Sequence, residues 1–120
     1  MHVNIQDYQS VSEVDAVIFE LFQPLASDSV ITLVNSGINT LNYHFQEYAI
    51  GASGIMTWVD LGAVGSTLNS ALQASQSVIV EVASTNSKVR LMSNASGGSV
   101  IDFAVSRYQQ RAAGAPLPVV

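Results

Sequence analysis

The chain has no cysteine and very few basic residues. Without cysteine, disulfide bonds and thiolate metal ligands are excluded. Lysine and arginine together number 4, and the net charge of −5 leaves no basic stripe that could neutralise nucleic-acid phosphates. No apolar run reaches the roughly 18 residues of a membrane-spanning helix. The first residues also lack the basic and apolar regions of a signal peptide, so we expect synthesis in a cytosol. From the scarcity of basic residues and of long apolar runs we expect no nucleic-acid partner and no membrane association.

Charge of either sign is scarce. Charged residues make up 11% of the chain, against about 25% in ordinary soluble domains. Their place is taken by 16 Ser, 5 Thr, 7 Asn and 8 Gln. A hydroxyl or amide that finds a partner is much less costly to desolvate than an unpaired ion, and interface cores are depleted in charge. We interpret the neutral surface as favouring burial in an assembly, although small β-domains also carry Ser/Thr-rich faces.

The middle of the chain contains two strand-like runs separated by a turn. Val30–Val34 is rich in β-branched residues. In the second run, Tyr43 and Phe45 belong to an alternation of apolar and polar residues at period two. Between the runs, Asn35–Thr40 contains the Asn, Ser and Gly residues that favour turns. The pattern predicts a local antiparallel hairpin over residues 29–48.

Further strand-like runs occupy residues 14–22, 55–61, 77–83, 88–92 and 99–107. The run at 14–22 is apolar on both faces, which predicts a strand covered on two sides, and the runs at 77–83 and 88–92 predict a second hairpin. Trp58 is expected to anchor the core. Residues 62–76 are expected to form a loop with at most one helical turn. Together the runs predict an all-β protein, a single antiparallel β-sandwich of the immunoglobulin-like or jelly-roll type.

The two ends of the chain differ from the middle. Residues 1–13 alternate weakly and predict an N-terminal arm or edge strand, while residues 14–108 are expected to form the sandwich. Residues 109–120 are expected to be an extended C-terminal arm, because Pro116 and Pro118 cannot donate backbone hydrogen bonds. The residues expected to bind a partner lie in these ends and are Val3, Ile5, Tyr108, Pro116, Leu117, Pro118 and Val119.

The sequence offers no motif for chemistry. His44 lies on the polar side of its strand, no nucleophile elbow accompanies it, and we expect a plain surface histidine. The two histidines are isolated, and no zinc or calcium spacing occurs. The carboxylates Asp60, Glu81 and Asp102 are scattered, without a spacing that pairs an acid with a base. We therefore predict no catalytic residue, no metal ligand and no cofactor.

Several stretches of the sequence resemble the small β-sandwich proteins of tailed-phage virions, especially capsid decoration (cement) proteins. The resemblance covers roughly residues 14 to 108 and rests on residue order in the stretches Val30–Phe45, Trp58–Gly62, Leu68–Val82, Val89–Ala95 and Val100–Arg107. It implies a non-enzymatic homo-oligomer, typically a trimer, that binds the major capsid protein on the outer surface of the virion.

Other functions stay open at this point. Similar neutral sandwiches also occur as tail, neck or fibre components. A carbohydrate-binding module would need two or three exposed, coplanar aromatic rings, for which the candidates are Tyr43, Tyr48, Trp58 and Tyr108. An enzyme is the alternative that the residues favour least.

Overall fold

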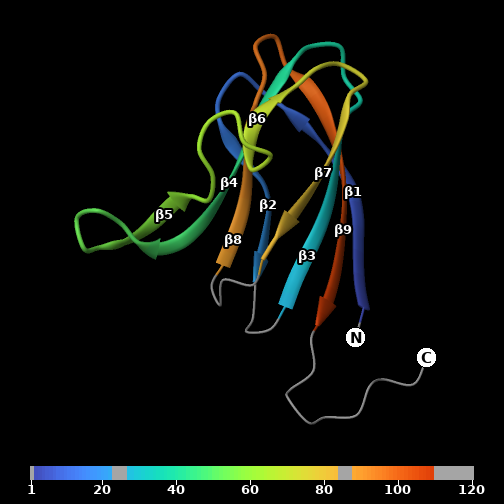
Figure 1. The fold of residues 1–120 in the computed structure, drawn as a ribbon. Helices are drawn as coiled ribbons and strands as arrows, with labels where there is room; N and C mark the ends of the chain where they lie inside the picture. The colour runs from blue at the N-terminus through green and yellow to red at the C-terminus, as the bar shows by residue number, and fades with distance from the viewer. Residues whose placement is uncertain (1, 23–26, 84–87, 110–120) are drawn as a thin grey trace.

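Strands dominate the computed structural model, which describes residues 2–22, 27–83 and 88–109 (Figure 1). The prediction of an all-β antiparallel sandwich is confirmed. In the described residues the strands are β1 (His2–Val11), β2 (Ala16–Phe22), β3 (Ser27–Asn35), β4 (Leu41–Ile50), β5 (Met56–Asp60), β6 (Asn69–Leu72), β7 (Ser77–Val82), β8 (Lys88–Asn94) and β9 (Ser99–Gln109).

The strands form two antiparallel sheets. The first sheet has the order β1-β9-β3-β7, and the second has the order β2-β8-β4-β5, with β6 also paired to β4. Strand β1 pairs with β9, β2 with β8, β3 with β7 and β4 with β6, as if one long antiparallel ribbon had been rolled up. The β3–β9 and β4–β8 pairs complete the two sheets. This is the strand arrangement of a jelly roll, which decides between the two predicted sandwich types.

Both predicted hairpins are wrong. Strand β3 lies in the first sheet and β4 in the second, and β7 and β8 are separated in the same way. The runs themselves are strands, as predicted, but the chain crosses between the sheets after β3 and again after β7. Strands β4 and β5 do form a local hairpin, with Gln46 opposite Asp60 and Ile50 opposite Met56.

Asn35 explains why the chain crosses over after β3. Its fully buried side chain donates from Nδ2 to the carbonyls of Asn39 (2.7 Å) and Leu72 (2.8 Å). Its Oδ1 accepts from the backbone N–H of Gly37 (3.1 Å) and from Ser99 Oγ (2.7 Å). A Cβ on Gly37 would collide with Ser99, so only glycine allows this close approach to β9. The residues expected to close a hairpin instead attach the turn to β6 and β9.

The expected loop at residues 62–76 contains an additional strand. Strand β6 pairs with β4. Its Leu72 lies opposite Leu41 of β4, and its Ser70 lies opposite Tyr43 of β4. The polar residues Asn69 and Ser70 concealed this short strand in the sequence. Leu72 is nevertheless buried in the core, and no helical turn forms there.

Strands β1 and β2 lie at the edges of their sheets. The backbone of β1 is paired with β9 along its whole length. Strand β2 buries Ile18 and Leu21, but Val17 is 38% exposed. The expectation of a strand covered on both sides is therefore wrong for β2, because an edge position and a bulge between Val17 and Phe19 turn part of it to solvent.

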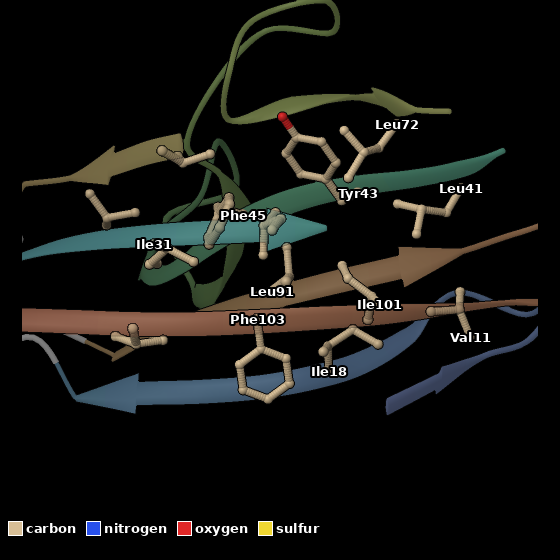
Figure 2. Close-up of a cluster of buried hydrophobic side chains, with 14 of the residues drawn as sticks. Val11, Ile18, Ile31, Leu41, Tyr43, Phe45, Leu72, Leu91, Ile101 and Phe103 are labelled. Atoms are coloured by element: carbon tan, nitrogen blue, oxygen red, sulfur yellow. The ribbon is translucent and has the colours of Figure 1, made fainter. Parts of the chain in front are cut away.

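Between the two sheets lies a continuous apolar core (Figure 2). Phe45 and Leu91 point inward from the second sheet, and Ile101 and Phe103 do so from the first. Phe19 links the two sides, because its ring centroid lies 4.8 Å from that of Phe103 and 6.4 Å from that of Phe45. The inward faces predicted from period-two alternation in β4 and β9 are confirmed. The outer faces of both sheets are therefore left for other contacts.

Candidate functional site

The β4–β5 hairpin projects from the body of the sandwich (Figure 1). Strand β4 pairs with β8 only as far as Glu47, so Tyr48 to Ile50 are paired with β5 alone. Tyr48 lies opposite Trp58, and Ile50 lies opposite Met56. Residues paired in this way share one face of a ribbon, as do alternate residues along a strand. These side chains therefore form one row along the outer face of the hairpin.

The end of this row is apolar and open to solvent. Ile50 is 69% exposed, Met56 47% and Tyr48 39%, and Ile55 at the adjoining turn is 67% exposed. We call these four residues the hairpin strip. Large apolar side chains exposed side by side mark interaction sites, whereas single ones need no explanation. The sequence signal was the presence of Tyr48 and Ile50 on the same side of β4 as His44 and Gln46, where polar residues were expected.

Trp58 lies at the base of the hairpin strip, and the prediction that it anchors the core is wrong. It is partly buried on the outer face, where the guanidinium carbon of Arg90 lies 4.1 Å from the centre of its ring. The Tyr48 ring lies 5.4 Å away on the hairpin. Arg90 Nε also donates to Gln46 Oε1 at 2.9 Å. This cation–π contact holds the hairpin against β8.

The aromatic candidates for carbohydrate stacking do not form one open platform. Tyr43 is buried in the core, and its hydroxyl donates to the carbonyl of Thr67 at 2.8 Å. The Trp58 ring is covered by Arg90 on one face. Tyr48 is the exposed ring of these three, and no second described candidate lies parallel to it.

His44 sits between two carboxylates and is not a plain surface histidine. Its Nδ1 lies 2.8 Å from Asp60 Oδ1, and its Nε2 lies 2.8 Å from Asp15 Oδ2. Ionised carboxylates only accept hydrogen bonds, so His44 bonds to both of them when its imidazole is protonated and both ring nitrogens donate. Gln46 Nε2 also donates to Asp60 Oδ1 at 3.0 Å. The cluster joins the segment before β2 to β4 and β5.

The pKa values of this cluster follow from its contacts. Partial burial by itself lowers the pKa of His44, but the hydrogen bonds to Asp15 and Asp60 and their negative charges outweigh it, so the pKa is raised above its usual value of 6.5. The pKa of Asp60 is lowered, mainly by the hydrogen bond from His44. Partial burial raises this pKa, and the hydrogen bond from Gln46 lowers it further. Both His44 nitrogens have a carboxylate as their hydrogen-bond partner, Asp60 at Nδ1 and Asp15 at Nε2. In the described ranges no cluster of His, Asp and Glu is arranged to hold a metal ion.

A groove of about 490 Å³ lies on the outer face of the first sheet. Its lining includes the small residues Thr32 and Ala104, which lie opposite each other on β3 and β9. Ile79, which is 67% exposed on β7, continues the same row beyond Thr32. We call this surface the sheet groove, and it is lined by Gln6, Asp7, Tyr8, Thr32, Val34, Asp102, Phe103 and Ala104.

Three of the partner-binding residues predicted from the sequence belong to described strands. The backbones of Val3 and Ile5 lie on the edge strand β1, and that of Tyr108 lies on β9 opposite His2 and Asp28. Pro116, Leu117, Pro118 and Val119 lie outside the described residues. Of the predicted residues, the three that are described belong to strands of the first sheet, whereas the hairpin strip belongs to the second sheet and was missed by the sequence reasoning. The part of the chain that is described contains no helix capable of spanning a bilayer.

No family model matches the sequence, and no curated protein matches it either. The structure is similar to a chain of the Bacillus endospore appendages, which are described as disulfide-linked pili. The TM-score is 0.55 at 13% identity, and the match covers 92% of this chain and 88% of the other. This likeness shows the fold.

Two structures of infectious bursal disease virus also match, more weakly. For the Gx strain the TM-score is 0.40 at 13% identity, and for the Gt strain it is 0.35 at 14% identity. The matches cover 91% and 93% of this chain, which spans only 32% and 36% of those viral chains.

Proposed function

We propose that the protein is a non-enzymatic structural subunit that acts by binding other protein subunits in a larger assembly. The observation that carries the proposal is the hairpin strip, where large apolar side chains are exposed on a ribbon that projects from the sandwich. A two-stranded ribbon outside a core is marginal on its own, so a solvent-exposed apolar face there has no role in folding the sandwich. Docking on another subunit accounts for it.

The assembly that we propose is a virion, with the protein as a decoration or cement protein on the outer capsid surface. The major capsid protein is the proposed partner, and a homotrimer is the proposed form. Support comes from the resemblance of residue order described above and from the charge content of 11%. A neutral surface loses little hydration energy when it is buried between subunits.

The extended C-terminal residues are the proposed fastener. Pro116 and Pro118 restrict the backbone around Leu117 and Val119, so little conformational entropy is lost when this segment binds. Val3, Ile5 and Tyr108 are proposed to contribute to the same contact, because β1 and β9 are paired neighbours.

Mass spectrometry of purified virus particles tests this proposal. We expect the protein in many copies per particle, together with the major capsid protein, and its removal should make the heads less resistant to heat. Absence of the protein from particles, while they contain the other structural proteins encoded nearby, would refute the virion assignment.

A second candidate is the subunit of an extracellular polymer. The observation that favours it is the fold shared with a pilus protein over 92% of this chain. These 120 residues contain no cysteine, so they cannot supply disulfide links of the kind named for those pili. Negative-stain electron microscopy of the concentrated protein distinguishes the two candidates, because only a pilus-type subunit should form filaments that continue to lengthen.

A further inference from the structure

A cluster of side chains connects the two edges of the second sheet on its outer face. Strand β2 forms one edge and β5 the other, with β8 and β4 between them. His44 lies on β4 and Asp60 on β5, while Asp15 lies in the β1–β2 connection, residues 12–15, directly before β2. The backbone pairs β2 with β8 and β5 with β4. The His44 side chain therefore links two segments that the backbone ladder separates by two strands.

The two contacts of His44 require a proton. Its Nδ1 lies 2.8 Å from Asp60 Oδ1, and its Nε2 lies 2.8 Å from Asp15 Oδ2. A neutral imidazole has one N–H and one lone pair. A lone pair that faces an ionised carboxylate oxygen at this distance repels it, so a neutral His44 keeps one contact and loses the other. The His44 side chain is 21% exposed, so its proton can pass to water.

Asp60 is the carboxylate that a neutral His44 keeps. Backbone pairing of β4 with β5 fixes its position, and the N–H of Leu61 donates to the carbonyl of Phe45 at 2.9 Å. Asp15 lies outside the strands, and its side chain is 37% exposed. Asp15 is therefore the carboxylate that can turn to water when the imidazole loses a proton.

The β1–β2 connection is tied to the turn between β8 and β9. The buried Ala95 N–H donates to the carbonyl of Ser12 at 2.8 Å. Asn94, the last residue of β8, donates from Nδ2 to Asp15 Oδ1 at 3.3 Å. Release of Asp15 from His44 weakens the attachment of the connection to this turn. The Ala95 N–H therefore reports whether the connection is closed.

The other charged side chains around the cluster have their own places. On the outer face, Glu20 of β2 lies opposite Arg90 of β8, in the cross-strand row next to that of His44. In the β1–β2 connection, Glu13 Oε1 accepts from the Gly97 N–H at 3.2 Å. Three uncharged residues share the cross-strand row of His44, and they are Met92, Val17 and Asn69.

We propose that His44 is a proton-operated switch. When protonated, it fastens the β1–β2 connection to β4 and β5, and when it loses the Nε2 proton it releases Asp15 and the connection opens. Partial burial lowers the pKa of His44, but the hydrogen bonds and charges of the two aspartates outweigh it and raise the pKa above 6.5. The connection is therefore closed at weakly acidic pH and opens as the pH rises through the raised pKa. This inference goes beyond the proposed assembly and does not depend on it.

Hydrogen exchange at two backbone amides tests the switch in the wild-type protein. After correction for the intrinsic pH dependence of exchange, protection of the Ala95 N–H should fall about three- to tenfold between about pH 6 and pH 9, as expected when a partly exposed ion pair is lost. Protection of the Leu61 N–H should not change, because β4 and β5 stay paired. Nitrogen-15 spectra of the His44 ring should show protons on both nitrogens at the lower pH and on Nδ1 alone at the higher pH.

Asp15→Asn separates the switch from general effects of pH. The new amide oxygen can accept from Asn94, and the new amide N–H can donate to the unprotonated Nε2 of a neutral His44. A neutral imidazole then fits both neighbours, so protection of the Ala95 N–H should no longer fall with pH. Glu20→Gln is the matched control, because it also removes one carboxylate from the outer face of the second sheet but lies outside the row of His44. It should keep the wild-type pH dependence.

Four results would overturn the inference. The first is constant protection of the Ala95 N–H across this pH range, and the second is an equal fall at Leu61, which would mean that the whole sandwich loosens. The third is a neutral His44 with its proton on Nε2, because Asp60 would then be the carboxylate released. The fourth is an Asp15→Asn protein that keeps the wild-type pH dependence. Melting temperatures at both pH values establish that each variant is folded.

Discussion

Replacing Asn35 by alanine should cause a large loss of stability without removing any apolar side chain. The Asn35 side chain makes four hydrogen bonds, and the one to the Leu72 carbonyl is buried. A buried acceptor left without a donor costs about 1–3 kcal/mol, and each partly buried bond contributes about 0.5–1.5 kcal/mol net. Because neighbouring bonds are not additive, we expect Asn35→Ala to lower the free energy of unfolding by about 3–5 kcal/mol.

Urea denaturation followed by Trp58 fluorescence measures this change. Asn42→Ala is the matched control, because its exposed Nδ2 makes one 3.2 Å hydrogen bond to Asn94 Oδ1 and its loss should cost less than about 1 kcal/mol. Asn35→Asp should also destabilise, since it keeps an acceptor for Gly37 and Ser99 but places a carboxylate against the carbonyls of Asn39 and Leu72. If the free energy of unfolding of Asn35→Ala lies within about 1 kcal/mol of the wild-type value, Asn35 does not hold the crossover.

Three other predictions concern the core, the pH response and the C-terminal residues. Phe45→Ala should lower the free energy of unfolding by about 3–5 kcal/mol, because the ring is fully buried, whereas Ile50→Ala should change it by less than about 0.5 kcal/mol; equal effects in urea denaturation would contradict the assigned faces. The pKa of His44 is raised in the folded protein, so its ion pairs stabilise fully below about pH 6.5 and this contribution is lost as pH rises through the folded pKa. The melting temperature of His44→Gln should therefore approach that of the wild type between about pH 6 and pH 9, and a constant gap would argue against a protonated His44. Deleting residues 112–120 should leave the melting temperature unchanged but reduce binding to capsid shells, and undiminished binding would exclude the C-terminal residues as the fastener.

The inward faces of the strands could be predicted from the sequence. Tyr43 and Phe45 in β4, and Ile101 and Phe103 in β9, alternate with more exposed residues and are buried as expected. Period-two alternation is a local property, because successive side chains of a strand point to opposite faces. The regular spacing of the strand-like runs, the turn residues between them and the absence of a convincing helical pattern then sufficed to predict an antiparallel sandwich.

The tertiary structure decided which strands pair and what gathers on the outer faces. Alternation in β3 and β4 is the same whether the two strands pair with each other or lie in opposite sheets, so the hairpin prediction had no local signal against it. The crossover depends on Asn35 contacting Leu72 and Ser99, which are distant in the sequence. Arg90 over Trp58, His44 between two carboxylates and the groove across β1, β9 and β3 likewise exist only after long-range pairing has placed distant residues side by side.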